Sequence, residues 1–198
     1  MTSRTMIAVL RSFPLRTAAL FLLFSGHCAA QSIASPVEMH LPLLTKVIEY
    51  DRTFREKINK VVKLGVIYQK SWRPSAAVFE EVLSVTSRAA FTVCGFPVEI
   101  VPIDVGGDAS VHELLGKHSI DILYLAPVRG VSIEEITSAS EEQHFRTITG
   151  VPQYVEHGIA IGIDLRNDRP LIVINLPAAK ACGADLSAQV LRLARVVE

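Results

Sequence analysis

The chain has 198 residues, enough for one domain of ordinary size around a single core. Hydrophobic residues make up 49% of it and charged residues 20%, which excludes a disordered chain and fits a compact α/β domain. The formal net charge is zero, so nothing in the composition favours binding to nucleic acid.

The first 30 residues have the pattern of a signal peptide. Residues 1–16 are basic, residues 18–24 are apolar, and Cys28-Ala29-Ala30 places small residues where a signal peptidase reads them. The apolar run is too short to span a bilayer as a mature helix. We therefore predict cleavage before Gln31, export to the periplasm of a Gram-negative type of cell, and a mature domain over residues 31–198.

Removal of this leader changes the charge balance. Its three arginines have no acidic counterpart, so 17 of the 20 basic side chains remain against all 20 acidic ones. Such a balance gives no attraction to an anionic membrane. Attachment of a lipid to Cys28 is the alternative to simple secretion, but His27 directly before it is a poor residue for a lipidation site.

The first half of the mature sequence alternates between helical and strand patterns. Apolar residues recur at helical spacing in some segments and form short β-branched runs in others. In chain order, the patterns predict a helix over residues 37–50, a polar connection over 51–60, a strand over 61–68, a helix from Pro74 to about Thr92 that Gly95 ends, and a strand over 98–105.

The next part continues this alternation after a turn at Gly106-Gly107. The predicted elements are a helix over residues 111–117 capped by Ser110 or Asp108, a strand over 120–125, a polar and exposed helix over 133–142, a short strand over 146–150, and a link over 154–158. The strand over 120–125 is apolar throughout, which suggests that both of its faces are buried.

The C-terminal segment is predicted to be a hairpin followed by two helices. Two β-branched apolar runs flank Asn167-Asp168, and both of these residues tolerate the left-handed conformation that a tight turn requires. Asn175 and Pro177 are suited to open a short helix, and Gly183 is suited to end it. A longer helix is predicted to follow and to continue to the end of the chain.

These elements together predict the fold class. Strands that alternate with helices imply right-handed β-α-β crossovers and a mostly parallel sheet. No internal repeat or low-complexity tract interrupts the order. We therefore predict an α/β fold, a single three-layer domain with a mostly parallel sheet, a C-terminal β-hairpin that adds an antiparallel edge, and a terminal helix.

The C-terminal segment also resembles the signature of the YfiR-like family of small periplasmic proteins. The matching residues are Ile174-Asn175-Leu176, Ala178-Ala179, Gly183, Ser187 and Leu191 to Ala194. The resemblance extends back to the helix around Leu41–Leu44 and the strand Leu64–Tyr68, so it covers most of the mature chain. It includes no catalytic motif.

This resemblance implies a function without chemistry. Similar proteins repress a membrane-bound diguanylate cyclase through the periplasmic sensor domain of that enzyme, which affects cyclic-di-GMP signalling and biofilm formation. The resemblance also implies a homodimer and a redox dependence. The alternative function is that of a single-lobe periplasmic solute-binding protein, which takes a small solute near Trp72 and Gly106-Gly107 and feeds a transporter or a sensor kinase.

Cys94 and Cys182 are a disulfide candidate, because they are an even pair in an oxidising compartment once the leader is removed. A bond between them would close a loop of about ninety residues and stabilise the fold by roughly 4–5 kcal/mol on the chain-entropy model. We expect both cysteines at helix ends. The alternative is a pair of buried free thiols.

The loop around Trp72 is the candidate interface or ligand site. Trp72 lies between Lys70 and Arg73, just past the strand over 61–68, at the end of a parallel strand where α/β proteins bind ligands or partners. The alternative is a Trp that folds over its own loop. Gly106-Gly107 lies between a strand and a helix, but two glycines without a further motif indicate a tight turn more than an anion site.

The sequence offers no catalytic or metal-binding pattern. His112 and His118 are six positions apart and so do not share a helix face, and neither a paired-cysteine nor a nucleophile motif accompanies them. Adjacent glutamates such as Glu80-Glu81 diverge by about 100° on a helix, which is typical of solvated faces. We predict a protein that is not an enzyme, with no cofactor and no metal.

Overall fold

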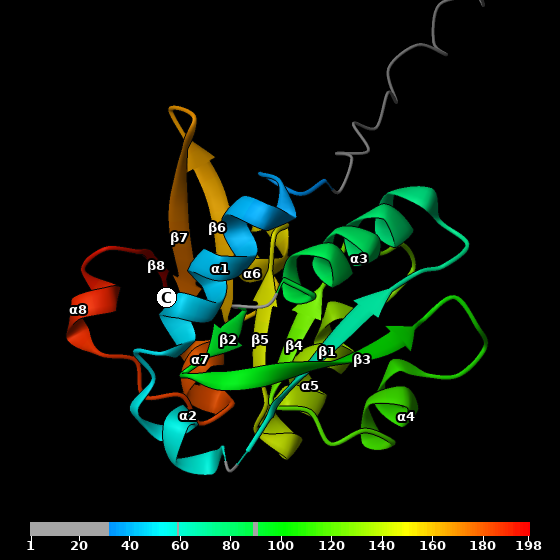
Figure 1. The fold of residues 1–198 in the computed structure, drawn as a ribbon, viewed down its shortest axis with the longest axis horizontal. Helices are drawn as coiled ribbons and strands as arrows, with labels where there is room; N and C mark the ends of the chain where they lie inside the picture. The colour runs from blue at the N-terminus through cyan, green and yellow to red at the C-terminus, as the bar shows by residue number, and fades with distance from the viewer. Residues whose placement is uncertain (1–31, 59, 89–90) are drawn as a thin grey trace, which may run out of the picture. The chain divides into compact units, whose positions relative to one another are not determined.

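The computed structural model describes residues 32–58, 60–88 and 91–198 (Figure 1). The predicted signal peptide, with Cys28, lies outside the described residues. The helices and strands follow in the order α1 (Val37–Ile48), α2 (Arg52–Lys57), β1 (Val62–Tyr68), α3 (Arg73–Thr86), β2 (Thr92–Val93), β3 (Phe96–Asp104), α4 (Val111–Gly116), β4 (Ile122–Leu125), α5 (Ile133–Gln143), β5 (Arg146–Thr149), α6 (Pro152–Glu156), β6 (Ile161–Arg166), β7 (Arg169–Asn175), α7 (Leu176–Ala181), α8 (Ala188–Leu191) and β8 (Arg195–Val197).

The strands of the described chain form one eight-stranded sheet in the order β2-β3-β1-β4-β5-β6-β7-β8. The strands from β3 to β6 pair in parallel, β6 and β7 pair antiparallel, and β7 and β8 pair in parallel. The sheet is therefore mostly parallel, as predicted. Helices connect the parallel strands because a parallel crossover needs a long connection.

Two apolar cores flank the sheet, so the domain has three layers (Figure 1). In β4, Ile122 and Tyr124 face the core under α1 and α3, whereas Leu123 and Leu125 face the core under α4, α5 and α6. All four side chains are fully buried, which confirms the prediction of a strand covered on both faces. The helix α5, predicted to be exposed, buries part of its surface in the second core.

The C-terminal hairpin forms as predicted, with the turn and cap residues that the sequence indicated. Asn167 and Asp168 have φ values of 52° and 59°, and they connect β6 to β7 by a two-residue turn. The side chain of Asn175 caps α7 by accepting a hydrogen bond from the Ala178 amide at 3.0 Å. Gly183, with φ of 81°, follows the end of this helix.

The predicted polar connection over residues 51–60 is wrong, because Arg52–Lys57 forms α2. Asp51 caps this helix by accepting from the Thr53 amide, and Phe54 anchors it in the core. The polar composition of the segment reflects a short helix that is exposed on most of its surface. Its one apolar anchor gave no periodic signal.

The helix predicted to reach Thr92 ends earlier, at Thr86. Thr92 and Val93 instead pair with Phe96 and Pro97 as a small antiparallel hairpin. Cys94 and Gly95 form its turn with φ values of 52° and 81°. Cys94 therefore lies in a hairpin turn, and the prediction that it ends a helix is wrong.

The last predicted helix is much shorter than expected and covers only Ala188–Leu191. The chain then forms β8, which pairs with β7 over residues 195–197. Two consecutive valines favour an extended strand, and the pairing satisfies backbone groups of β7 that an edge strand would leave open. The edge of the sheet is therefore β8, not the hairpin.

Candidate functional site

The candidate interface lies at the carboxyl ends of the parallel strands, where the strand order reverses. From β1, the chain crosses to β3 on one side and then back over to β4 on the other. The loops that follow β1 and β4 therefore leave the sheet next to each other in space. In an open α/β sheet, this switch point is the usual place for a ligand crevice.

Here the two loops are joined by a reciprocal pair of hydrogen bonds. Gln69, which follows β1, donates through Nε2 to the carbonyl of Arg129 at 2.8 Å. The Arg129 amide donates in turn to Gln69 Oε1 at 2.8 Å. Because one side-chain amide satisfies both backbone groups of Arg129, the loops are held together at the position where a crevice would open.

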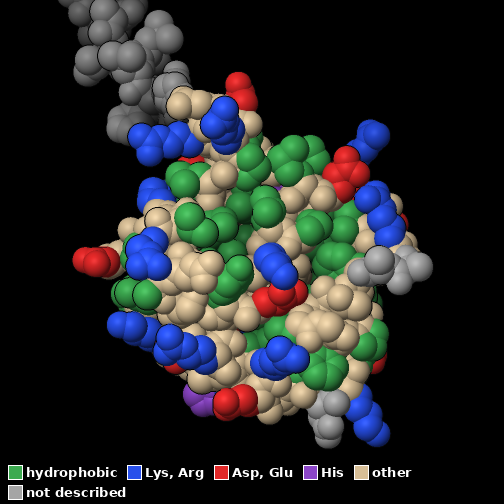
Figure 2. Space-filling view, turned by 60° about the vertical axis from the view of Figure 1, so that its left-hand side comes forward, with side chains coloured by type: hydrophobic (Ala, Val, Ile, Leu, Met, Phe, Trp, Pro, Cys, Tyr) green, Lys and Arg blue, Asp and Glu red, His purple; other side chains and the backbone are tan. Residues whose placement is uncertain are grey.

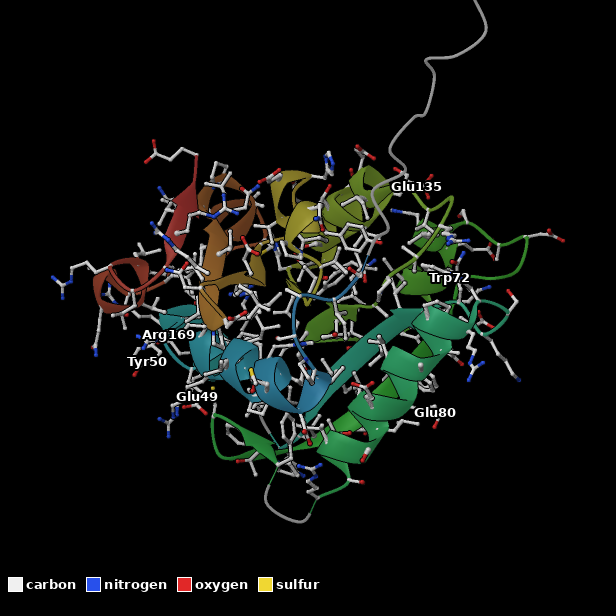
Figure 3. All side chains as sticks on the ribbon, turned by 90° about the horizontal axis from the view of Figure 1, so that it is seen from above. Glu49, Tyr50, Trp72, Glu80, Glu135 and Arg169 are labelled. Carbon is white, nitrogen blue, oxygen red and sulfur yellow. The ribbon has the colours of Figure 1, made fainter. Side chains whose placement is uncertain are left out.

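Trp72 contacts the second loop through its indole ring. The guanidinium carbon of Arg129 lies 4.3 Å from the ring centroid, within the range of a cation–π interaction. The indole is half-buried, whereas Arg129, Lys70 and Arg73 are exposed. Figure 3 shows Trp72 at the end of the molecule opposite to Tyr50 and Arg169. The tryptophan is therefore partly covered by a side chain of the neighbouring loop, and the two loops together leave a surface that combines one aromatic ring with cations.

The loop after β3 joins the same cluster through Asp104. Its Oδ1 accepts from the Lys70 amide at 3.1 Å and from the Gly106 amide at 2.9 Å. The Gly106 amide is thus already occupied by a carboxylate of the chain itself. This favours the tight-turn interpretation of Gly106-Gly107 over an anion site.

The structure thus brings together most of the residues singled out from the sequence. Trp72 and Lys70 lie in the loop that follows β1, and Arg73 is the first residue of α3. The backbone amides of Lys70 and Gly106 donate to the same carboxylate oxygen of Asp104. Gly107 is exposed, and a side chain added there would meet no atom within 4 Å.

The sequence prediction missed the two residues that close the cluster, Gln69 and Arg129. Arg129 follows the apolar strand over residues 120–125 by a few positions, so the strand-end rule that selected Trp72 applies to it as well. No sequence signal pairs it with Gln69, because the two residues are 60 positions apart and meet only through the sheet order.

Two surface hollows lie elsewhere on the molecule. The first, of about 290 Å³, lies between α1 and α3 and is lined by Pro36, Glu38, Glu81, Ser84, Val85 and Arg88. The second, of about 480 Å³, lies at the hairpin tip and is lined by Arg166, Asn167, Arg169, Pro170 and Leu171. Neither of the two is at the switch point.

A buried ion pair fixes α2 to the sheet. Arg146 Nε donates to Asp51 Oδ2 at 2.5 Å, and both side chains are 1% exposed. The guanidinium also donates to Thr53 Oγ1 and to the carbonyls of His144, Cys182 and Gly183. Burial alone would raise the pKa of Asp51, but the hydrogen bonds from Arg146 and from the Asp185 amide outweigh it and lower the pKa. Every polar group in this cluster has a partner, so its role is structural.

A second buried cluster fixes α1. His40 is fully buried, and its Nδ1 lies 2.8 Å from the carbonyl of Ser35 while its Nε2 lies 2.8 Å from Tyr124 Oη. The carbonyl can only accept, so Nδ1 carries the proton and Nε2 accepts from the tyrosine hydroxyl. Burial lowers the pKa of His40, which keeps the ring neutral.

The disulfide predicted between Cys94 and Cys182 is not formed, and both cysteines are free thiols. Cys94 lies in the turn of the β2–β3 hairpin, whereas Cys182 follows α7 and donates from Sγ to the carbonyl of Ala179. The thiol of Cys182 is thus buried behind its own helix. Burial raises the pKa of both thiols, so neither is an activated nucleophile.

Within the part of the chain that the structure describes, no three His, Cys, Asp or Glu side chains gather as a metal site. His112 forms an exposed pair with Glu142, with 3.8 Å between Nε2 and Oε2. No helix in residues 32–58, 60–88 and 91–198 has the length and hydropathy needed to cross a membrane.

Comparison with known families gives one match. The family model described as YfiR/HmsC-like matches residues 73–195, which is more than half of the chain. The matched region begins at α3 and ends at the start of β8. None of the curated proteins matches the chain closely enough in sequence to count as a relative.

Several solved structures share the fold at low sequence identity. An ABC domain in complex with L-Trp from Streptococcus pneumonia aligns with a TM-score of 0.58 and 16% identity over 82% of this chain. A conserved domain protein from Vibrio cholerae aligns with a TM-score of 0.61 and 16% identity over 83%. The ligand-free, open form of a substrate-binding protein with adhesive properties from Clostridium difficile aligns at 0.52 and 18% over 69%. The chain spans 60%, 60% and 54% of these three structures.

Proposed function

The chain belongs to the YfiR/HmsC-like family, and on that premise we propose that it is a periplasmic regulator that represses a membrane-bound diguanylate cyclase. It would do so by contacting the periplasmic sensor domain of the enzyme, and so lower cyclic-di-GMP signalling and biofilm formation. Members of this family regulate through protein contacts and do not catalyse reactions. The signal-peptide pattern over residues 1–30 supports the periplasmic location, and a homodimer is part of the proposal.

The observation that carries this proposal is the loop cluster at the switch point. The bonds between Gln69 and Arg129 join the two loops at the place where a small ligand would enter. What they leave on the surface is a half-buried indole beneath a guanidinium, with Lys70 and Arg73 exposed beside it. Tryptophan and arginine are the residues that most often dominate the binding energy of protein interfaces.

The second candidate function is solute binding, the alternative raised by the sequence. Two of the similar structures are an ABC domain bound to L-Trp and a substrate-binding protein. Their likeness to this chain is below 25% identity and supports the fold alone. A thermal unfolding scan of the mature protein with each of the twenty amino acids distinguishes the candidates, because a ligand that binds only the folded state raises the unfolding temperature. We expect no shift.

The regulatory proposal is tested by cyclic-di-GMP levels in the native host. Deletion of the gene is expected to raise the cyclic-di-GMP concentration, and the wild-type gene is expected to restore it. The double variant Trp72→Ala with Arg129→Ala should fail to restore it, because it removes both groups of the cation–π pair. Truncating interface residues of this kind typically weakens binding by about 2 kcal/mol or more, or about thirtyfold.

The matched control is Lys180→Ala, an exposed cation on α7 away from the loop cluster. This variant should restore the cyclic-di-GMP level as the wild type does. Equal amounts of each variant in the periplasm are confirmed by immunoblot. If deletion leaves the cyclic-di-GMP level unchanged, the proposed function is wrong.

A further inference from the structure

The side chain of Arg129 is held in place although it is exposed. Its guanidinium stacks on the Trp72 ring at 4.3 Å, and no other guanidinium of the described residues stacks on an aromatic ring. The backbone that carries it is fixed by the two hydrogen bonds to Gln69. A side chain held at both ends loses little conformational entropy when it binds a partner.

The hydrogen-bond donors of this guanidinium are unused. In the described part of the chain, the Arg129 side chain forms no hydrogen bond and no ion pair, since both of its bonds to Gln69 come from the backbone. Stacking covers one face of the planar group and leaves the N–H groups along its edge free. An arginine in this arrangement can donate two parallel hydrogen bonds to one carboxylate.

Two more cations flank the indole in the sequence. Lys70 and Arg73 are exposed, and among the described residues neither forms an ion pair. The carboxylate of Asp104 accepts from the backbone amides of Lys70 and Gly106, and that of Glu134, at the start of α5, accepts from a serine hydroxyl. The described part of the chain therefore supplies no carboxylate partner to any of the three cations.

Exposed basic side chains by themselves do not mark a site. Figure 2 shows them dispersed among hydrophobic and uncharged side chains on the side of the molecule that carries the hairpin of β6 and β7. Arg169 in this hairpin is exposed and forms no ion pair, but no aromatic ring of the described residues stacks on it. What distinguishes the loop cluster is a guanidinium that an aromatic ring and a fixed backbone hold in position.

The surroundings of Arg129 favour a carboxylate that a protein carries over one on a small solute. A small solute needs a concave pocket that encloses most of its surface. Arg129 and Trp72 line neither the hollow between α1 and α3 nor the one at the hairpin tip. A partner protein needs no such pocket, because it brings its own surface to cover the half-buried indole around the charged contact.

We propose that Arg129 binds an exposed aspartate or glutamate of the partner protein through two parallel hydrogen bonds, next to an apolar contact on Trp72. This inference rests on the proposed function, since it takes the loop cluster as the interface. It adds the chemistry that the partner presents there, and it makes Arg129 a residue that selects the partner.

Zero-length crosslinking in the native host tests the proposal. A water-soluble carbodiimide joins an amine to a carboxylate that is in direct contact with it. The full-length variant Arg129→Lys keeps the positive charge and supplies the amine. The cell envelope is treated with the carbodiimide, and the crosslinked peptides are identified by mass spectrometry. We expect position 129 to be joined to an aspartate or glutamate of one other protein.

The matched control is Arg169→Lys, which places the same amine at an exposed arginine that Figure 3 shows at the other end of the molecule from Trp72. It should give no crosslink to that carboxylate. The joined loops should survive the substitution of Arg129, because Gln69 bonds the backbone of that residue and not its side chain.

A binding measurement checks the charge of the contact independently. Protein purified from the periplasm is sedimented with membranes of the deletion strain. The variant Arg129→Gln should bind about tenfold or more weakly than the wild type, because it loses hydrogen bonds between charged groups. Raised salt should weaken the wild type more than this variant, since only the wild type makes the ion pair.

Several results would overturn the proposal. They are no crosslink from position 129, a crosslink to a second copy of the chain, equal crosslinking from Arg169→Lys, and the same salt dependence for the wild type and Arg129→Gln. If sodium succinate or sodium phosphate raised the unfolding temperature of the wild type and not of Arg129→Gln, the site would take a free anion, which would also contradict the proposal.

The outcomes separate this inference from the proposed function. A crosslinked carboxylate in a protein that is not a cyclase supports the contact with Arg129 and contradicts the repression of a cyclase. Cyclic-di-GMP levels that respond to gene deletion, without any crosslink from position 129, contradict the contact with Arg129 alone.

Discussion

Two buried polar clusters attach the first helices to the sheet, and they differ in charge. Arg146 and Asp51 form an ion pair that fixes α2, whereas His40 and Tyr124 form a neutral pair that fixes α1. The ion pair is surrounded by further hydrogen bonds to side chains and carbonyls, while the neutral pair has in addition the carbonyl and the hydroxyl of Ser35. A buried charge needs several hydrogen-bond partners to offset its loss of hydration, whereas a buried neutral pair needs fewer.

Both clusters also cross the boundary of the family match. Asp51 and His40 precede residue 73, where the match begins, and Arg146 and Tyr124 lie inside it. The segment with α1 and α2 is therefore fixed by partners within the matched region.

The largest effect is expected from Arg146→Met, which removes the cation and leaves the carboxylate of Asp51 buried without it. Breaking a buried pair in this way costs about 3–5 kcal/mol. Urea unfolding of the mature protein measures the loss. Arg52→Met is the matched control, because its ion pair with Asp185 is exposed and is worth about 1 kcal/mol or less. A loss for Arg146→Met as small as that of the control would show that the charged cluster is not essential.

A smaller effect is expected from Gly150→Ala, which tests the packing of the neutral cluster. An added Cβ would lie 2.7 Å from His40 Cε1 and 2.8 Å from Nε2, so the ring must move. Overpacking of this kind costs about 1–3 kcal/mol. Gly107→Ala is the control, since a Cβ there meets nothing within 4 Å. Equal midpoints of urea unfolding for the two variants would contradict the geometry around His40.

Tyr124→Phe tests the hydrogen bond of the neutral cluster and keeps the shape of the ring. It leaves His40 Nε2 buried without a donor, which costs about 1–2 kcal/mol. Since the imidazole then lacks its partner, α1 should also exchange its amide hydrogens faster. Hydrogen exchange of residues 37–48 measures this directly, and unchanged protection of α1 would count against the role given to the pair.

The smallest effect is a dependence on pH that separates the two clusters. The pKa of His40 is lowered from its usual 6.5, so the unfolded chain binds a proton that the folded chain rejects. The free energy of unfolding should therefore fall as the pH drops below about 6.5. The pKa of Asp51 is also lowered, from 3.8, so its contribution is lost only at more acid pH.

The variant His40→Gln isolates the first contribution. Between pH 6.5 and 5, the wild-type protein should lose about 1 kcal/mol more than the variant, because only the wild type has the buried imidazole. Urea unfolding at half-unit steps of pH gives the two slopes. Parallel slopes would show that His40 does not titrate differently in the folded and unfolded chain.

Much of the fold was predictable because its signals are local. The turn at Asn167-Asp168, the cap at Asn175 and the apolar strand over residues 120–125 each depend on residues next to one another, and the structure has all three. The errors fall where local signals are weak. The helix α2 has one apolar anchor, and the two-residue strand β2 is too short to show a period.

The candidate site was predicted only in part for the same reason. Trp72 and Lys70 stand next to a recognisable strand end, and the sequence pointed to them. Arg129 and Gln69 are joined only through the order of the strands in the sheet. The pairing of Cys94 with Cys182 was an inference from their number, and the number of thiols does not determine the distance between them.

The amino-acid sequence by itself determined the α/β class, the mostly parallel sheet and the resemblance to the family, since these depend on periodicity and on turn residues close together in the chain. The tertiary structure alone decided that Arg146 meets Asp51, that β8 completes the sheet, and that Gln69 meets Arg129. Such contacts join residues that are far apart in the chain, 95 positions in the case of Arg146 and Asp51. They exist only once the whole chain has buried its apolar faces, and no local pattern of side chains carries them.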